Sequence, residues 1–183
     1  MGKNAAYAAQ HAEEAKEQMR RYGIPASVIL AQAILESSNG QSQLSRECNN
    51  HFGIKCHNWT GPTQYHDDDA RGECFRVYQD AKESYEDHSR FLAKQPRYSR
   101  LFSLNTTDYK GWAHGLKSCG YATNPQYANK LIQIIELYRL QDYDKAKSYD
   151  RFMATQSGTD VPINAKGTLQ PKQIFKDNKY ILS

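Results

Sequence analysis

The segment from Gly23 to Gly40 constrains the fold more than any other part of the sequence, because it predicts an apolar helix with clear ends. Gly23 closes a preceding helix expected over residues 4–22, since glycine tolerates the left-handed conformation of a C-terminal cap. Pro25 opens the second helix at the position where its missing N–H costs nothing, and Asn39-Gly40 stops it. Apolar residues recur at helical spacing on two neighbouring stripes: Ile24, Val28, Ala31 and Leu35 on one, and Ile29 and Ala33, together with Glu36, on the other.

The middle of the chain, residues 48–78, differs in composition: it is rich in aromatic residues and turn formers and has little helical periodicity. Residues 63–68 and 73–78 predict two short strands, joined by a turn over residues 69–72. Three further helices are expected after the hairpin, each with a start signal. These signals are Ser84 with Asp87 before residues 88–93, Thr107 or Asp108 before a helix to residue 118 that Gly120 closes, and Asn124-Pro125 before a helix carrying Tyr127, Leu131, Ile134, Ile135 and Tyr138.

Helices with one small β excursion predict an α+β fold that is mostly α. This arrangement resembles the lysozyme-like folds, in which a helical lobe and a β-hairpin lobe face each other across a cleft. The 183 residues have room for one domain and a tail. Helical periodicity weakens after about Asp144, and Pro162, Gly167 and Pro171 follow. We therefore expect one domain over residues 1–143 and a C-terminal tail or extension over residues 144–183.

Charge and composition narrow the class of partner. The net charge of +4 suits a polyanionic surface such as a cell wall or a nucleic acid. Nucleic-acid binding is disfavoured, because the basic residues are interleaved with acids and form no stripe. The 13 tyrosines suit carbohydrate binding, where a ring stacks on a sugar, but they also fill ordinary cores. No apolar stretch is long enough to span a bilayer. We expect a monomer.

The start of the chain, residues 1–4, lacks the apolar core of a secretory signal. This leaves open a signal that has been removed, another export route, or action after cell lysis.

The four cysteines permit two disulfides. Cys56 and Cys74 flank the predicted hairpin and can meet across its base, which leaves Cys48 to pair with Cys119. Four buried thiols in a reduced protein are an almost equally good alternative. Structural zinc is disfavoured, because neither paired CxxC elements nor HExxH is present. The residues considered for zinc are Cys48, His51, Cys56, His57, His66 and Cys74. No cofactor is expected.

Glu36 is the outstanding candidate for chemistry. It lies in the last turn of the apolar helix, against Ile29 and Ala33, where partial desolvation raises the pKa of a carboxyl group. The negative end of the helix dipole adds to that shift. A glycosidase acid needs such a setting, because it must keep its proton near neutral pH and give it to the leaving oxygen. Taken alone, the same local pattern also suits a solvated glutamate at a helix end.

A resemblance to a known family adds to this interpretation. Five blocks in order resemble glycoside hydrolase family 73, the bacterial endo-β-N-acetylglucosaminidases of the flagellar-rod and autolysin type. One block alone is a weak signal, whereas five in the family's order are specific. The tail lies outside the resemblance, and residues 1–143 are then the glucosaminidase domain. The blocks are Tyr22–Gly40, Asn49–Cys56, Phe75–Tyr78, Glu83–Leu92 and Gly120–Leu131.

The resemblance implies cleavage of the β-1,4 bond between GlcNAc and MurNAc in peptidoglycan, with Glu36 as the general acid. It also implies that Tyr121, in the Gly-Tyr-Ala-Thr block, lies near the reacting sugar and bonds its acetamido group or steadies an oxocarbenium-like transition state. Tyr127 is a candidate for the same wall, although its helical spacing fits a core role equally well. Weaker candidates for the sugar-binding surface are Asn39, Phe52 and Trp59, the last of which suits packing on the hairpin equally well.

The sequence departs from the family at the second carboxylate. Many members carry a glutamate in the first hairpin strand, where this chain has Asp67-Asp68-Asp69. Counting back from Gly72 favours Asp68 as the partner carboxylate, with Asp69 as the first alternate, and a solvated acidic turn is the other interpretation. The partner either activates water and gives inversion, or orients a 2-acetamido group that attacks in its place.

Competing functions stay open. A muramidase, a lytic transglycosylase, and a catalytically silent glycan-binding or assembly module all suit a similar fold. In each case the partner is the peptidoglycan glycan strand. The place of action is the bacterial cell wall, periplasmic or extracellular, by an unknown export route; an autolysin, a phage lysin and a secreted effector are all compatible with it.

Overall fold

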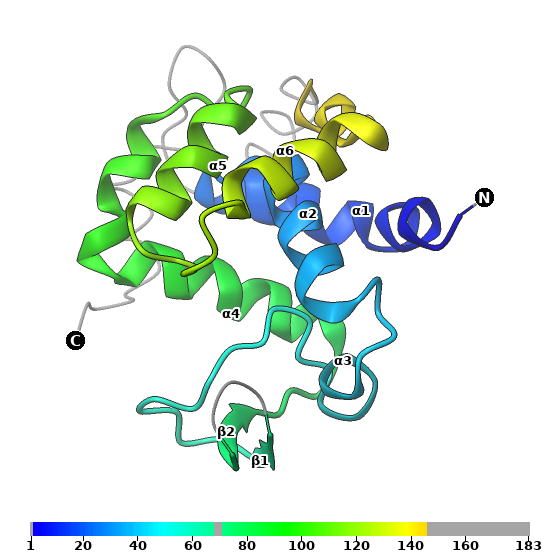
Figure 1. Cartoon of the computed structure of the whole chain (residues 1–183), viewed down its shortest axis with the longest axis vertical. Coiled ribbons are helices and arrows are strands. Elements are labelled where there is room, and N and C mark those ends of the chain that lie inside the picture. The colour runs from blue at the N-terminus through cyan, green and yellow to red at the C-terminus, as the bar shows by residue number, and fades with distance from the viewer. Residues whose placement is uncertain (1, 68–70, 146–183) are drawn as a thin grey trace, which may run out of the picture.

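The computed structural model describes residues 2–67 and 71–145 of the chain, and it is mostly helical with one small hairpin. Figure 1 shows α2 in the middle of the helical lobe, with α5 and α6 above α4 and the hairpin with α3 below it. The predicted fold class is therefore confirmed. The helices are α1 (Lys3–Tyr22), α2 (Ala26–Ser37), α3 (Gln43–Cys48), α4 (Ala81–Lys94), α5 (Tyr109–Ser118) and α6 (Tyr127–Leu137), with 3-10 helices η1 (Pro96–Ser103) and η2 (Leu140–Lys145).

The two ends of α2 follow the predicted signals closely. Gly23 caps α1 in the left-handed conformation at φ 78°, and Pro25 precedes the first residue of α2. At the other end Ser38, one residue earlier than predicted, caps α2 at φ 50°, and the left-handed turn continues through Asn39 and Gly40. Every residue from Ala26 to Ile34 is buried, so α2 is enclosed by other elements rather than presenting one apolar stripe.

Asp144, the first residue of the predicted tail, is buried in the packed body. Its carboxylate, from η2, accepts hydrogen bonds from the backbone N–H and the hydroxyl of Ser27, at 2.8 and 2.5 Å. It therefore caps the N-terminal end of α2. Residues 146–183, which make up most of the predicted tail, lie outside the described residues. The domain boundary stays a prediction.

The hairpin has shorter strands than predicted, β1 (Thr63–His66) and β2 (Glu73–Arg76), paired antiparallel with Thr63 opposite Arg76. After Arg76 the N–H of Val77 still donates to the carbonyl of Pro62, just before β1, and the N–H of Tyr78 then donates to the carbonyl of Cys48 at the end of α3. The second of these bonds ties the hairpin to α3.

The predicted helix start agrees with the structure for α5 but not for α4 or α6. Asp108 caps α5 as expected, accepting a hydrogen bond from the N–H of Gly111. The Ser84 and Asp87 start signal is wrong, because α4 begins at Ala81 with Asp80 as its cap. The Asn124-Pro125 signal places α6 too early, because the chain first makes a turn in which the N–H of Tyr127 donates to the carbonyl of Asn124. Elements that no signal predicted are α3, η1 and η2.

One of the two predicted disulfides is present. Cys56 and Cys74 are bonded across the base of the hairpin, so the fully reduced alternative is wrong. Cys48 and Cys119 are both free thiols, and the second predicted pairing is also wrong. Cys48 ends α3, next to the hairpin, where its thiol donates to Gln64. Cys119 instead caps α5 in the helical lobe.

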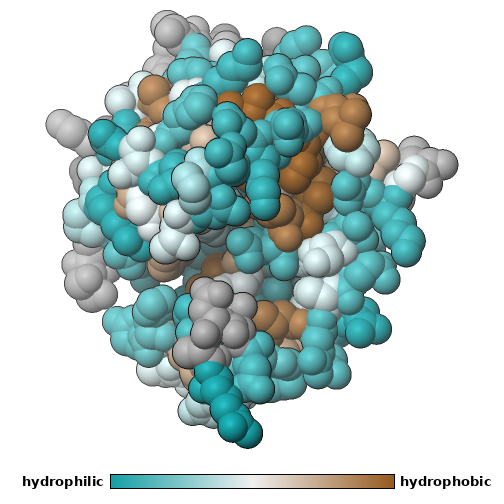
Figure 2. Space-filling model, in the orientation of Figure 1, coloured by the Kyte–Doolittle hydropathy of each residue, from teal (hydrophilic) through white to brown (hydrophobic). Residues whose placement is uncertain are grey.

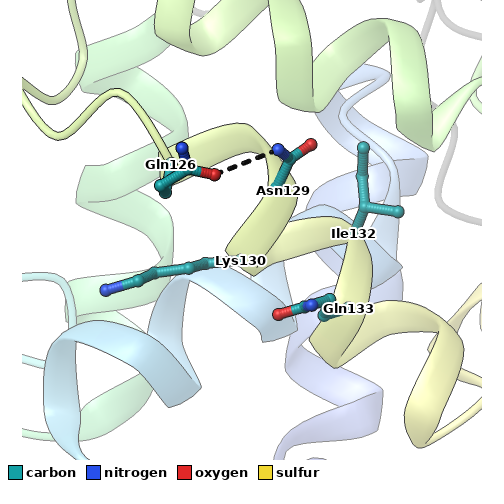
Figure 3. Close-up of a pocket in the computed structure, with 5 residues that line it drawn as sticks. All are labelled: Gln126, Asn129, Lys130, Ile132 and Gln133. Atoms are coloured by element: carbon teal, nitrogen blue, oxygen red, sulfur yellow. Dashed lines mark hydrogen bonds between the residues drawn. The ribbon is translucent and has the colours of Figure 1, made fainter.

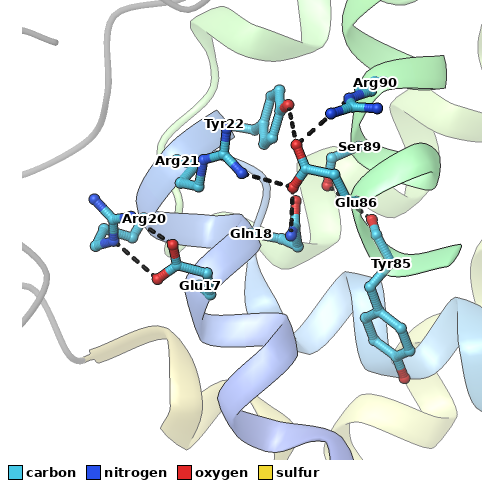
Figure 4. A network of polar contacts seen from close by, with 9 residues as sticks. All are labelled: Glu17, Gln18, Arg20, Arg21, Tyr22, Tyr85, Glu86, Ser89 and Arg90. Atoms are coloured by element: carbon cyan, nitrogen blue, oxygen red, sulfur yellow. Dashed lines mark hydrogen bonds and ion pairs between the residues drawn. The ribbon is translucent and has the colours of Figure 1, made fainter. Parts of the chain in front are cut away.

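A polar cluster around Glu86 joins α1 to α4 (Figure 4). One carboxylate oxygen accepts from Gln18 and Arg21, each at 2.8 Å, and the other accepts from Tyr22 at 2.7 Å. Arg90 lies 3.5 Å from the same carboxylate. Charge-assisted bonds of this kind fix the two helices in register beside the core.

Within the described residues, no helix combines the length and the hydropathy that crossing a membrane requires.

Candidate active site

The end of α2 places Glu36 at the wall of a cleft. The following residue, Ser37, is buried and its hydroxyl donates to the carbonyl of Ala33, which fixes the last turn of the helix. The carboxylate of Glu36 faces Gly53, where an added Cβ atom would lie 3.3 Å from Oε2. Gly53 also has φ 65°, so both its backbone conformation and its close approach to Glu36 favour glycine.

Glu36 is more exposed than the sequence predicted. Its side chain is exposed to solvent in the free protein, although it lines a cavity. Ile29 and Ala33, against which it was expected to pack, are fully buried in the core. A ligand that fills the cleft would therefore remove further water from Glu36.

The loop opposite Glu36 is held by one amide side chain and one disulfide. Asn50 accepts from the N–H of Ile54 at 3.0 Å and donates to the carbonyls of Ile54 and Arg76, which closes the loop and ties it to β2. Two residues after Ile54, Cys56 is bonded to Cys74 in the same strand. The loop that carries Gly53 is therefore rigidly attached to the hairpin.

Phe52 forms part of the cleft floor. It is buried, and its ring stacks on His88 of α4 at a centroid distance of 4.0 Å. Both ring nitrogens of His88 are buried, and no hydrogen-bond partner for them is present among the residues that the structure describes. Burial lowers the pKa of His88 to about 3, so the ring is neutral and serves as an aromatic support.

Two tyrosines form the opposite wall. The rings of Tyr121 and Tyr127 stack at 5.7 Å, and Gln32 donates to the hydroxyl of Tyr127 at 2.9 Å. Burial raises the pKa of Tyr121 well above its usual value, with Tyr127 and the carboxylate of Glu36 adding to the shift. Burial likewise raises the pKa of Tyr127. Both hydroxyls therefore keep their protons, and that of Tyr121 is a hydrogen-bond donor near Glu36.

The cavity between these walls has a volume of about 550 Å³ and is lined by both lobes. In Figure 2 the surface is hollowed between the helical lobe above and the hairpin lobe below. Its lining brings together four of the residues singled out in the sequence, namely Glu36, Phe52, Tyr121 and Tyr127. Lining residues that the sequence did not single out as candidates for the glycan site include Lys55, His57, Phe91, Arg97, Tyr98, Thr123, Asn124 and Lys130.

Two other candidates lie outside this cavity. Asn39 is not among the lining residues; it takes a left-handed conformation after α2 and donates to Asn4 at 3.0 Å, which ties the turn to α1. Trp59 is half-buried and packs on the hairpin, edge-on to Tyr78 and beneath Arg76. The hairpin-packing alternative for Trp59 therefore describes its contacts.

The acidic run is described only at its first residue. Asp67 is exposed and accepts a hydrogen bond from the N–H of Gly72 at 2.7 Å, which closes the turn of the hairpin. Asp68 and Asp69, the two candidates for the second carboxylate, lie outside the described residues. Their role stays a prediction.

Sequence comparisons agree with this geometry. A family model described as mannosyl-glycoprotein endo-beta-N-acetylglucosaminidase matches residues 12–140. Peptidoglycan hydrolase FlgJ of Escherichia coli (strain K12) is 34% identical over 161 residues, which cover 81% of this chain and 51% of FlgJ. Exo-glucosaminidase LytG of Bacillus subtilis is 35% identical, over 68% of this chain and 48% of LytG. The chain thus spans about half the length of these curated relatives.

Solved structures show the same fold. The glycoside hydrolase domain of FlgJ from Salmonella typhimurium is 30% identical, with a TM-score of 0.65, covering 85% of this chain and 99% of that domain. The catalytic domain of the autolysin Auto from Listeria monocytogenes is also 30% identical, with a TM-score of 0.66, covering 78% and 88% of the two chains. The match over residues 12–140 includes the cleft and both of its walls. The chain belongs to the glucosaminidase family, glycoside hydrolase family 73.

Proposed function

We propose that this protein is an endo-β-N-acetylglucosaminidase that cleaves the β-1,4 bond between GlcNAc and MurNAc in peptidoglycan. The observation that carries the proposal is the position of Glu36, at the wall of a cavity of about 550 Å³ that also holds Phe52, Tyr121 and Tyr127. A saccharide in that cavity lies between an acidic side chain and aromatic walls. Membership of the glucosaminidase family supports the choice of reaction and of sugar.

Glu36 is the general acid in this mechanism. A bound glycan displaces water from the exposed carboxyl and so favours its protonated form, which gives its proton to the leaving oxygen. Tyr121 donates a hydrogen bond to the acetamido group of the reacting sugar, or turns its hydroxyl oxygen toward the anomeric carbon and the ring oxygen, where positive charge develops. Phe52 and Tyr127 shape the pocket that holds the ring.

Asp68 is the proposed partner carboxylate, and Asp69 is the alternate. Asp68→Asn is expected to reduce the turnover number about 100-fold or more, as loss of an acid–base group does. Asp67→Asn is the matched control, because Asp67 closes the hairpin turn through the N–H of Gly72. A large loss in Asp69→Asn with little loss in Asp68→Asn would transfer the role to Asp69.

Digestion of purified peptidoglycan tests the bond specificity. Mass spectrometry of the products is expected to show reducing-end GlcNAc. Reducing-end MurNAc would identify a muramidase, anhydro-MurNAc a lytic transglycosylase, and binding without products a silent glycan-binding module; each would contradict the proposal. The early products also separate an endo-acting enzyme, which releases long fragments first, from an exo-acting one, the activity named for the relative LytG.

A further inference from the structure

The cleft carries an excess of positive charge. Of the residues that line it, Lys55, Arg97 and Lys130 are cationic and only Glu36 is acidic. Lys55 is already paired with Glu73 at 3.1 Å. Within residues 2–67 and 71–145, neither Arg97 nor Lys130 takes part in an ion pair, and both side chains are exposed at the rim. Two cations at the rim are therefore available to an anionic group of the substrate.

The positive charge extends across the cleft, from η1 to the hairpin lobe. Burial lowers the pKa of His57, and the positive charges of Arg76, Lys55 and Arg97 lower it further. Arg97 therefore lies close enough to the hairpin lobe for its charge to be felt at His57. On its own lobe Arg97 approaches Gly120, at the start of the loop that carries Tyr121, to 3.5 Å from where a Cβ would lie.

Lys130 joins the cleft to a second hollow on the outer face of α6 (Figure 3). This groove, of about 440 Å³, shares Lys130 with the cleft. Uncharged amide side chains, those of Gln126, Asn129 and Gln133, dominate its lining. The amide of Asn129 donates to the carbonyl oxygen of Gln126 at 3.2 Å. Amides both donate to and accept from peptide groups, and the half-buried Ile132 offers an apolar contact. The groove thus suits a short polar peptide that leaves the cleft past Lys130.

We propose that Arg97 and Lys130 bind carboxylates of the stem peptide attached to MurNAc, and that this peptide leaves the cleft along the groove on α6. The inference rests on the proposed function. The sugars of an unmodified GlcNAc–MurNAc strand are uncharged once the lactyl group is linked to peptide, so the peptide carboxylates are the anions nearest to the scissile bond. Phosphate of a wall polymer offers a similar anion, and the substrate used below contains none.

The test compares two soluble substrates of equal length. One is a peptidoglycan fragment with intact stem peptides and no wall polymer, and the other is the same fragment with its carboxylates converted to carboxamides. The wild-type KM is expected to be lower for the carboxylate fragment. The KM ratio is the KM of the carboxamide fragment divided by that of the carboxylate fragment. Because exposed ion pairs contribute modestly, each of Arg97→Ala and Lys130→Ala is expected to reduce this ratio about two- to fivefold. The double variant is expected to bring that ratio close to one.

Matched controls separate this role from a general effect of charge. Arg46→Ala, on α3, and Lys117→Ala, on α5, each remove one positive charge from a residue that does not line the cleft. Both are expected to keep the wild-type KM ratio. An equal loss in these controls, or equal KM values for the two substrates in the wild type, would overturn the proposal.

Binding to the Glu36→Gln variant separates this proposal from the proposed function. Titration of that variant with the two fragments is expected to show the same preference for carboxylates, and its loss in the Arg97→Ala background. If the wild type binds the carboxylate fragment preferentially but releases no reducing ends, the proposed function is contradicted and the peptide site is still supported. Cleavage of both fragments with no preference in binding would remove the peptide site alone.

Discussion

At the scale of single residues, the candidate site depends on a carboxylate that faces a glycine. Gly53 lets the loop approach Glu36, and a side chain added there would meet Oε2 at 3.3 Å. The positive φ of Gly53 adds a backbone reason for the same residue. Glu36 is therefore open to a substrate on one side and confined on the other.

The hydroxyl of Tyr121 is expected to act in the reaction. Tyr121→Phe is predicted to lower kcat about 100-fold while KM changes little, because a hydroxyl that stabilises charge developing on the reacting sugar acts mainly in the transition state. Tyr127→Phe is the matched control. It removes the buried bond to Gln32, and should cost about 1 kcal/mol of unfolding free energy instead. Steady-state kinetics and denaturant unfolding of both variants make the comparison; equal kcat losses would contradict a special role for Tyr121.

Some of these residues could be found from the sequence, and others could not. Glu36 stands out because a helix stop follows it directly, and Tyr121 because it lies in a family block. Arg97 carries no such signal, and Lys130, although it lies in the same block as Tyr121, is not marked there as a cleft residue. Both line the cleft only because η1 and α6 pack beside the same loop. The exposure of Glu36 was mispredicted because helical spacing reports which face is apolar, not how far a long side chain at the helix end reaches.

At the scale of elements, the disulfide between Cys56 and Cys74 connects the cleft loop to β2. It closes a loop over a sequence separation of 18 residues, and a crosslink of that length stabilises a small domain by about 3 kcal/mol. Cys56→Ser with Cys74→Ser, or reduction of the wild type, is expected to lower the melting temperature and to raise KM through the loosened loop. Unfolding with and without a thiol reductant measures this.

Cys119→Ser is the control for the disulfide prediction. Cys119 is a free thiol, so this variant should respond to reductant as the wild type does. A double serine variant with unchanged stability would contradict the assigned role of the crosslink.

Glu86 is expected to hold α1 against α4. Glu86→Gln removes the charge that Arg21, Tyr22 and Gln18 bind, and should cost about 1 to 2 kcal/mol of unfolding free energy. Glu13→Gln makes the same chemical change at a side chain that is 77% exposed and forms an ion pair with Lys16, where the expected cost is below about 0.5 kcal/mol. Chemical denaturation compares the two; equal costs would contradict the account of the cluster.

Element boundaries were predictable where a cap is local. Gly23 and Asp108 mark helix ends through their own backbone or side chain, and both predictions are confirmed. The start of α4 differs from the prediction because Asp80, four residues before the chosen signal, accepts from the N–H of Glu83, while the Glu83 carboxylate accepts from the N–H of Gln79. The free state of Cys48 and Cys119 depends on the distance between two lobes, which spacing along the chain does not report.

At the scale of the whole molecule, the buried histidines make stability depend on pH. Burial lowers the pKa of His88 to about 3 and that of His51 to about 4, while both are near 6.5 in the unfolded chain. Between these values the unfolded chain binds protons that the folded protein does not. Stability contributed by neutral His88 is therefore present above about pH 6.5 and is lost as the pH falls, by up to about 1.4 kcal/mol per pH unit. Asp144 acts in the opposite direction, because burial raises its pKa to about 7.

His88→Phe isolates this contribution. The variant keeps a ring against Phe52 and breaks no hydrogen bond to the described residues. Its stability relative to the wild type is therefore expected to increase as the pH is lowered from 7 to 5. Urea unfolding of both proteins at several pH values measures the difference, and a difference that is independent of pH would contradict the burial of a neutral His88.

The central claim is that Glu36 gives its proton to the leaving saccharide. The most direct measurement is the rate at which wild type and Glu36→Gln release reducing ends from one peptidoglycan fragment, with fragment binding and melting temperature recorded for both. The account predicts at least about a 100-fold lower rate for Glu36→Gln, with binding and folding retained. A folded Glu36→Gln variant that releases reducing-end GlcNAc at the wild-type rate would contradict it.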